Sequence, residues 1–451
     1  MTTRHVIPQN VDRNRSRKSG FPFALPFDSS LHSISRVWLI VICTWIVYLL
    51  ANYLLSLTTE SGQMAFYVYH AGAKSLLGSQ DLYSGITGWI YLYPPLLAQI
   101  LMPLAAYTHN TTSTVVWFSI NSAMMISTLS LLSHYIPQSK IRWLWLMPLV
   151  FIPFWQALYL GQITIIMMAL LAIIWMCIQE HHHVMAGMFL ALSIWIKVFP
   201  ALLVLYFLWR RDWYTMIGLI IGGLGLLGVQ IMISGPDLIL NFIDVLFELY
   251  SGGQPEATYE NLSIFGFASR LFQSNQFVIP LEINASLFSM MRIGLTISTL
   301  IISFFAIIRA RFTDTLENNR WRFDLEYSLV IMTILMLGST LWISGLPPLI
   351  LIYVLILRNV EKYRHPLLVK SIVAISFILI TIYQPMLVVF KGETLHALTL
   401  SIGFAGVMLV WSLLVWLLVM PNGKNIKTAQ PPPVYVPLKK MKFAAQTVLK
   451  N

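Results

Sequence analysis

Long apolar stretches without a single charged residue constrain this chain more than any other feature of its sequence. A membrane-spanning helix needs about 20 apolar residues, and most of these stretches can hold at least one. Only 10% of the residues are charged, whereas soluble domains carry about 25%. These charged residues are too few to cover a surface that faces water. The sequence therefore predicts an all-α polytopic membrane protein. The charge-free stretches are Val37–Thr59, Leu82–Ser139, Trp143–Gln179, Trp213–Pro236, Tyr327–Leu357 and Thr394–Pro421.

Turn-forming residues divide these stretches into separate helices. Thr108–Thr112, Leu160–Gln162 and Ser344–Pro348 place Gly, Pro, Asn or Thr between apolar runs. The division predicts a bundle of about twelve transmembrane helices within a membrane domain of residues 37–420. The predicted spans are 37–57, 93–107, 113–135, 142–159, 161–178, 184–208, 213–233, 285–309, 326–343, 346–358, 367–390 and 394–419.

Lysine and arginine positions predict the orientation of the bundle, because cytoplasmic segments of membrane proteins are enriched in them. They crowd the basic N-terminal segment 1–36 and the Pro-containing tail 421–451. Both termini are therefore expected on the cytoplasmic side of a bacterial plasma membrane, which requires an even number of spans, and twelve satisfies this. Segments 58–92 and 234–284 then become two large extracytoplasmic loops. Lys140 and Arg142 are two basic residues in a short outer loop, so this loop is an exception to the enrichment of basic residues on the cytoplasmic side.

Several other function classes are disfavoured. The net charge of +11 does not indicate a nucleic-acid partner, because the basic residues lie at the ends and in short loops. Cys43 and Cys177 lie in apolar runs and suggest neither a disulfide nor a metal cluster. The histidines of Glu180–His183 rarely converge on one ion without a further ligand. We expect membrane lipids as partners, with no metal, cofactor or nucleic acid.

The first outer loop contains the pattern of a short amphipathic helix. Its apolar positions are Phe66, Tyr69 or His70, Ala73 and Leu76–Leu77. Gly78 ends the pattern, and Tyr93 precedes two prolines where the next span begins. The spacing predicts a helix lying in the membrane interface with its aromatic residues at headgroup level. Alone, these features indicate only an interfacial anchor.

Lys197 is the clearest ionisable residue inside a predicted span, and charges at membrane depth are costly and often functional. Pro200 lacks an N–H donor and opens a kink nearby, so the cation beside it suits a phosphate oxygen. A lysine that reaches the interface, or one that pairs with a buried carboxylate, is an equally good explanation.

The second outer loop offers another phosphate-binding group. Arg270 is one of the few outer cations, and its planar guanidinium matches phosphate geometry. Asn261 and Ser263 either bind sugar hydroxyls or cap a helix, and capping is the better explanation of the two taken alone.

The order of these motifs resembles glycosyltransferase family 87, a bacterial family also known as a domain of unknown function and placed among the GT-C membrane transferases. The resemblance extends from about residue 60 to 350. The matching pieces are Leu76–Gly78 with Asp81–Tyr83, Tyr93–Pro95 with Pro103–Ala105, Gly161–Gln162, Ala186–Gly187 with Ile196–Pro200, Arg210–Trp213, Asn261–Ser263 with Arg270, and Trp342.

This resemblance implies a GT-C-like bundle with a site on the outer face. The donor would be a polyprenyl-phosphate sugar, and a hexose, mannose in the family, would pass to a lipid or glycan acceptor. The substrate-binding residues would be Tyr69, His70, Tyr93, Gln162, Lys197, Asn261, Ser263 and Arg270.

Two departures from the family pattern concern the chemistry. The resemblance implies a catalytic Asp at the start of the first outer helix, where this chain has Ala65. It also implies a His shortly after Trp342, where this chain reaches Gly345 without one. A carboxylate is still needed to deprotonate the acceptor hydroxyl. Glu60 is the first substitute as catalytic base, and Asp81 is the second.

Two alternatives to a transferase follow from the same residues. The losses at Ala65 and Gly345 favour a diverged relative that binds carrier lipid or assists a transferase. A bundle of twelve spans is also common among lipid or sugar transporters and flippases. Such proteins are usually built from internal repeats, and the sequence contains no evident one.

Overall fold

The computed structural model describes residues 36–59, 61–83, 91–251, 260–274, 278–313, 319–389 and 395–420. The chain divides into two units between Thr44 and Trp45. The described part of the first unit is the beginning of α1 (Arg36–Thr58). The elements below belong to the second unit, residues 45–451.

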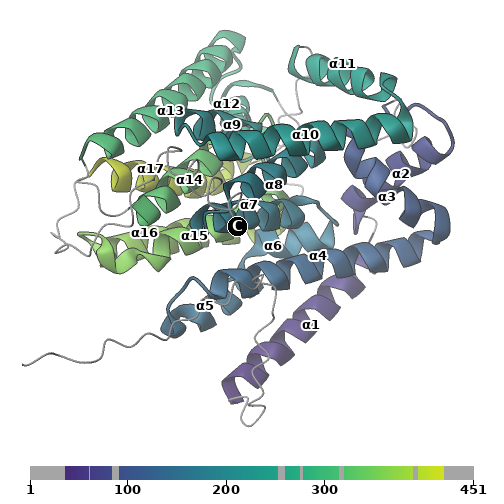
Figure 1. Cartoon of the computed structure of the whole chain (residues 1–451). Helices are drawn as coiled ribbons and strands as arrows, with labels where there is room; N and C mark the ends of the chain where they lie inside the picture. The colour runs from purple at the N-terminus through teal and green to yellow at the C-terminus, as the bar shows by residue number, and fades with distance from the viewer. Residues whose placement is uncertain are drawn as a thin grey trace, which may run out of the picture. The chain divides into compact units, whose positions relative to one another are not determined.

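Helices form nearly all of the regular structure among the described residues, which confirms the all-α class (Figure 1). Helices satisfy their backbone hydrogen bonds internally, as a lipid environment requires. The strands β1 (Val278–Ile279) and β2 (Leu395–His396) form one short parallel pair. The helices are α2 (Met64–Leu77), α3 (Pro95–Tyr107), α4 (Asn110–Ser133), α5 (Gln138–Val150), α6 (Ile152–Tyr159), α7 (Thr164–Gln179), α8 (His183–Ile196), η1 (Phe199–Ala201), α9 (Leu202–Trp209), α10 (Trp213–Ser234), α11 (Asp237–Ser251), α12 (Ile264–Phe272), α13 (Ala285–Thr313), α14 (Asn319–Leu337), η2 (Ile343–Gly345), α15 (Pro348–Arg358), η3 (Val360–Lys362), α16 (Pro366–Val389), η4 (Thr399–Ser401) and α17 (Ile402–Val419).

Among the described residues, six helices are long and apolar enough to cross a membrane, and α5 with α6 adds a seventh if this pair, bent by 56°, is one span. The chain is thus a polytopic membrane protein, but the expected count of about twelve full spans is wrong for these residues. The other predicted spans contain shorter apolar helices. Helices such as α7 and α15 are buried along most of their length by neighbouring helices, so their hydropathy reflects protein burial. The six are in α1, α4, α10, α13, α16 and α17.

One end of the helical bundle, here called the Arg210 end, is defined by a connected set of polar contacts. Tyr135 bonds to Glu180 (3.2 Å) and His183 to Asp212 (2.6 Å). The remaining contacts are Arg210–Glu326, Gln179–Asp324, Arg358–Asp324 and Lys140–Leu357. The turns after α4, α7, α9 and α15 and the start of α14 therefore lie together.

The opposite end, here called the Tyr93 end, is held together in the same way. Its contacts are Lys74–Asn110, Ala65–Leu160, Thr164–Ser344, Leu341–Asn261 and Gln99–Ser234. The turns before α4 and between α6 and α7 therefore lie beside the segment that precedes α15.

These contacts correct the predicted route of the chain between residues 93 and 208. The loop containing Lys140 was expected opposite to Arg358, yet Lys140 Nζ donates to the Leu357 carbonyl at 3.1 Å. Its lysine therefore shares an end with the other basic turns, and the local contradiction of the positive-inside rule disappears. The turn at Gly161 likewise lies at the Tyr93 end, opposite to its predicted side. Since α3 begins after Tyr93 and Asn110 lies at the same end, the expected span 93–107 does not cross the bundle.

The predicted span 184–208 is also corrected, because this segment turns back on itself. His183 and Asp212, at its two ends, are bonded to each other. Lys197, in its middle, lies at the Tyr93 end with its Nζ 5.5 Å from the Tyr93 ring centre. The helix breaks there because Lys197 is extended (φ −154°, ψ 125°) and Pro200 follows. We call the segment α8–η1–α9 the hairpin and Lys197 its apex.

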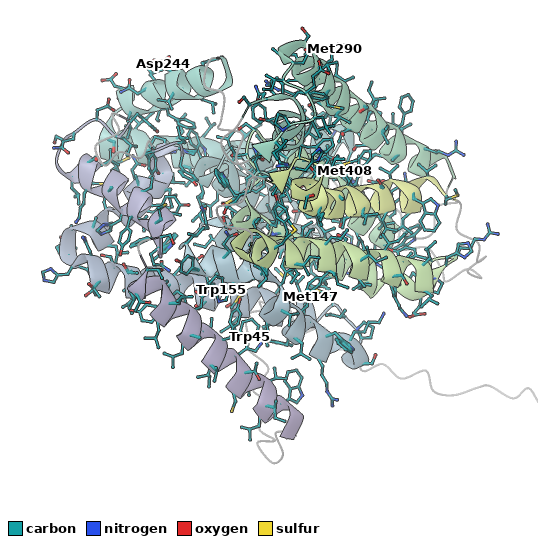
Figure 2. The ribbon with its side chains drawn as sticks, turned by 180° about the vertical axis from the view of Figure 1, so that it is seen from behind. Trp45, Met147, Trp155, Asp244, Met290 and Met408 are labelled. Atoms are coloured by element: carbon teal, nitrogen blue, oxygen red, sulfur yellow. The ribbon has the colours of Figure 1, made fainter. Side chains whose placement is uncertain are left out.

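The predicted outer loops contain helices of their own. Segment 58–92 holds α2, and segment 234–284 holds α11 and α12. Leu238 and Phe242 of α11 are buried, whereas Asp244 lies on its exposed side (Figure 2).

Cysteine labelling tests the corrected route. In a chain with Cys43 and Cys177 replaced by serine, we expect Arg142→Cys and Arg364→Cys to react with an impermeant maleimide from the same side of the membrane. His109→Cys should react from the other side, because the turn before α4 lies at the Tyr93 end. All three positions are exposed. Labelling of His109→Cys from the same side as Arg364→Cys, with Arg142→Cys reacting from the other side, would restore the original route.

Candidate functional site

The helix α2 is docked onto the turn between α6 and α7 by its own N-terminus. The backbone N–H groups of Gln63 and Ala65 donate to the carbonyls of Tyr159 (2.8 Å) and Leu160 (3.0 Å). Gly161 has a φ of +67°, and a Cβ there would lie 2.5 Å from Gln63 Oε1 and 2.8 Å from Phe66 Cβ. Only glycine fits both this backbone and this close approach.

The aromatic face of α2 is buried in protein, which corrects the expectation that it lies at headgroup level. Phe66 and Tyr69 have no exposed surface. The Phe66 ring stacks on Trp117 with centroids 5.5 Å apart, and Trp117 Nε1 donates to the Gly161 carbonyl at 2.7 Å. The helix and its end at Gly78 are confirmed, but its aromatic residues fix it to the bundle.

A short string of polar groups joins α2, the start of α3 and the α6–α7 turn. The Tyr69 hydroxyl lies 3.0 Å from Gln162 Oε1 and 3.2 Å from the Tyr93 hydroxyl. Tyr93 and Gln162 are partly exposed, unlike Tyr69. Three residues predicted to bind substrate from separate motifs therefore form one hydrogen-bonded group.

Lys197 completes this group, because the hairpin brings its apex to the same place. Its Nζ lies 5.5 Å from the Tyr93 ring centre and 6.0 Å from that of Phe199. Within the described residues it has neither an ion pair nor a hydrogen bond of its side chain, and it is half-buried. A cation flanked by aromatic faces and lacking a carboxylate is an electrostatically open position for an anion.

Ala65 and Gly345, where the resemblance implies an Asp and a nearby His, flank the same turn. Ala65 is bonded to Leu160 on one side, and the Thr164 hydroxyl donates to the Ser344 carbonyl at 2.6 Å on the other. Gly345 has room for a larger residue, since a Cβ there would meet only Leu341 at 3.5 Å. Positions distant in sequence therefore belong to one region at the Tyr93 end.

Asn261 and Ser263 act as caps and braces in the structure. The buried Asn261 Oδ1 accepts from the N–H groups of Ser263 and Leu341, and its Nδ2 donates to Ser339. The Ser263 hydroxyl caps α12 at Gly266 N (3.1 Å). The structure does not join either side chain to the Tyr69 group, so the capping interpretation accounts for both.

Arg270 is the predicted phosphate ligand that the structure does not support. It has no exposed surface. Its guanidinium donates to the Asn261 carbonyl and, at 3.4 Å, to Ser401. Burial lowers the pKa of this guanidinium. Arg270 therefore braces α12 against η4 and presents no surface to a phosphate.

Asn261→Ala is expected to destabilise the protein by about 1–3 kcal/mol, because buried backbone N–H groups lose their acceptor. The melting temperature in detergent should fall, while the affinity for a lipid phosphate stays within about twofold, since ΔΔG values of unconnected sites add. A fall in affinity without a fall in melting temperature would instead make Asn261 a ligand.

Of the remaining predicted residues, the described ones form no hydrogen bond with Tyr69, Tyr93, Gln162 or Lys197. His70 is buried against the Phe66 ring (centroids 5.4 Å), and burial together with Lys74 lowers its pKa. Asp81 is exposed and accepts from Tyr83 N at 3.0 Å. Glu60 lies outside the described residues. Glu260 directly precedes Asn261, and burial raises the pKa of its carboxyl.

The three histidines of the tract lie together at the Arg210 end. His181, His182 and His183 line a hollow at the Arg210 end, and His183 is bonded to Asp212. Within the described residues, no group of three or more His, Cys, Asp or Glu is arranged to hold a metal ion.

Comparison with known proteins gives a family and two relatives. A family model described as glycosyltransferase family 87 matches residues 91–340. A polyprenol-phosphate-mannose-dependent alpha-(1-2)-phosphatidylinositol mannoside mannosyltransferase of Mycolicibacterium smegmatis is 28% identical over 176 residues, covering 33% of this chain and 39% of the relative. Its counterpart from Mycobacterium tuberculosis is 30% identical over 169 residues, covering 32% and 39%. The chain thus matches about two-fifths of the length of these curated relatives.

Proposed function

The chain belongs to glycosyltransferase family 87, and from this premise we propose that it transfers a hexose, mannose in the first instance, from a polyprenyl-phosphate carrier to a lipid or glycan acceptor. The observation that carries the proposal is Lys197, a half-buried cation without a carboxylate partner in the described residues. Membership of a transferase family favours this reaction over the transporter and flippase alternatives.

The proposed reaction is a single displacement at the anomeric carbon of the donor sugar. A carboxylate removes the proton of the acceptor hydroxyl, whose oxygen forms the new glycosidic bond. The bond from the anomeric carbon to the phosphate oxygen breaks, and the polyprenyl phosphate leaves with the electron pair. The configuration at the anomeric carbon of the transferred sugar is inverted. Glu60 is the proposed base, with Asp81 second.

Lys197 would stabilise the leaving phosphate, because its charge is in place before the reaction and costs no reorganisation during it. Tyr93 and Gln162, partly exposed beside it, would hydrogen-bond the sugar or phosphate. His70 remains a proposed member of this group, and the low pKa caused by burial favours its neutral form.

The proposal places this chemistry in a GT-C-like bundle of a bacterial plasma membrane. The Tyr93 end would face outward and both termini the cytoplasm, so that the basic turns of the Arg210 end obey the positive-inside rule. The names of the two relatives give phosphatidylinositol mannoside as their acceptor. Because the match covers 39% of those proteins, a mannosylated lipid is one acceptor to test among several.

The test is transfer of radiolabelled mannose from polyprenyl-phosphate-mannose to a membrane lipid extract, with the purified wild-type protein beside Glu60→Gln. Label that moves to a new lipid only with the wild type would establish the transferase and Glu60 as its base. Tight donor binding without transfer would establish the diverged, lipid-binding relative, which Ala65 favours.

A further inference from the structure

The hairpin links the proposed phosphate position to the opposite end of the bundle. Its base is held by the His183–Asp212 bond and its apex is Lys197. The α8 leg lies side by side with α10 (Figure 1). A Cβ on Gly187 would lie 2.0 Å from the Thr215 carbonyl, so these two backbones are in direct contact. The leg formed by α9 packs against α14 and α10.

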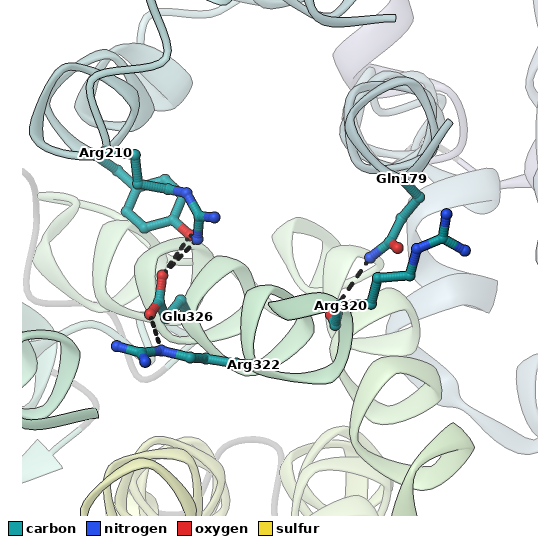
Figure 3. A network of polar contacts seen from close by, with 6 residues as sticks. Gln179, Arg210, Arg320, Arg322 and Glu326 are labelled. Atoms are coloured by element: carbon teal, nitrogen blue, oxygen red, sulfur yellow. Dashed lines mark hydrogen bonds and ion pairs between the residues drawn. The ribbon is translucent and has the colours of Figure 1, made fainter. Parts of the chain in front are cut away.

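The α9 leg is anchored by a buried ion-pair network centred on Glu326 of α14 (Figure 3). Arg210, at the end of α9, approaches Glu326 Oε2 at 2.7 Å, and the Tyr206 hydroxyl donates to the same oxygen at 2.9 Å. Arg322 donates to Glu326 Oε1 at 2.7 Å. The Glu326 side chain is 1% exposed, so these bonds are poorly screened and specify one geometry.

We propose that Glu326 is a positioning residue for Lys197, acting through Arg210, Tyr206 and the α9 leg. The inference rests on the proposed function, because it takes Lys197 as the group that meets the carrier phosphate. Since α8 is fixed to α10, the register of α9 on α14 decides where the two legs meet. Loss of the Glu326 anchor lets α9 shift and moves the apex away from Tyr93.

Asp324 supplies a matched control on the same helix. It is fully buried and ion-paired to Arg358 at 3.3 Å. It also accepts from Trp175 and Asn359 at 2.8 and 2.7 Å. Its partners lie on α7 and at the end of α15, outside the hairpin. Asp324→Asn therefore removes an equally buried charge without touching α9.

The experiment measures equilibrium binding of radiolabelled polyprenyl monophosphate to the full-length protein in lipid nanodiscs. Glu326→Gln should weaken binding about tenfold, a size typical of coupling between connected sites. Asp324→Asn should lower the melting temperature about as much as Glu326→Gln does. It should nevertheless change the affinity less than about twofold, because free-energy changes at unconnected sites do not influence one another. In a Lys197→Gln background, Glu326→Gln should cause no further loss of affinity.

Milder variants keep the test decisive if Glu326→Gln does not fold. Arg210→Lys retains the charge and should keep most of the affinity that Arg210→Gln loses. Tyr206→Phe removes two hydrogen bonds, one donated to Glu326 and one accepted from Arg210, but keeps the ion pair and should give a smaller loss. Equal effects of Glu326→Gln and Asp324→Asn on affinity would overturn the inference, and so would additivity with Lys197→Gln. If Lys197→Gln binds the phosphate as tightly as the wild type, Lys197 does not contact the phosphate. That part of the proposed function is then refuted, and the positioning role of Glu326 is refuted together with it.

Discussion

Lys197→Gln is expected to lower kcat/KM for transfer from polyprenyl-phosphate-mannose by about 10²-fold or more, the size seen when a preorganised electrostatic contact to a developing charge is removed. Glutamine keeps similar bulk but carries no charge, and no carboxylate among the described residues is bonded to Lys197 in compensation. Most of the loss should fall on kcat, because the negative charge on the phosphate grows as the glycosidic bond breaks. Initial rates with radiolabelled donor measure it.

Lys74→Gln is the matched control for this prediction. Lys74 is an exposed lysine at the same end, and its Nζ donates to Asn110 Oδ1 at 2.8 Å. Its removal should change kcat/KM less than twofold, within about 0.5 kcal/mol as for other surface substitutions. If both variants lose activity equally, the effect is one of general surface charge, and Lys197 has no special contact with the donor.

Ala65→Asp is expected to raise kcat by about 10²- to 10⁴-fold, the usual contribution of general base catalysis, if Ala65 stands where the family has its base. Position 65 lies in the first turn of α2, beside the turn that carries Gln162. A carboxylate in the first turn is favoured by the helix dipole, so the melting temperature should not fall. Transfer assays and thermal melts of the purified variant measure both.

Ala71→Asp controls for the added charge, since it places the same side chain six residues further along α2 at another partly exposed position. It should not raise kcat. An Ala65→Asp variant that folds and shows no gain, beside a Glu60→Gln variant that loses transfer, would assign the base to Glu60. Gain of activity in both Asp variants would show that local charge, and not position 65, is the limiting factor.

The membrane class and the family could be predicted from the sequence because both depend on local signals. Apolar stretches without charged residues indicate segments that lie away from water, and this holds whatever path the chain takes through the bundle. Motifs such as Tyr93-Pro-Pro and Lys197-Val-Phe-Pro are read residue by residue, and the match of the family model to residues 91–340 confirms the family. The helix α2 followed from its 3.6-residue spacing, although its aromatic face proved to be buried in protein.

The route of the chain could not be predicted, because hydropathy does not distinguish a helix in lipid from one surrounded by other helices. The segment 184–208 has the length and apolarity of a span, yet it turns back at Lys197. Only the His183–Asp212 and Arg210–Glu326 contacts reveal the return. The same holds for Arg270, whose charge suggested a ligand and whose burial makes it a brace.

The amino-acid sequence alone thus specified the membrane class and the family of this protein. Both follow from short segments, because apolar runs must satisfy their backbone hydrogen bonds within lipid and motifs are read from adjacent residues. Which of the motif residues meet was settled by packing between segments far apart in sequence. The helix α8 is in close backbone contact with α10, and Lys197, directly after α8, lies beside Tyr93. Asn261 bonds instead to Ser339, and Arg270 to Asn261 and Ser401, because most buried polar groups are hydrogen-bonded to whatever partners the fold supplies.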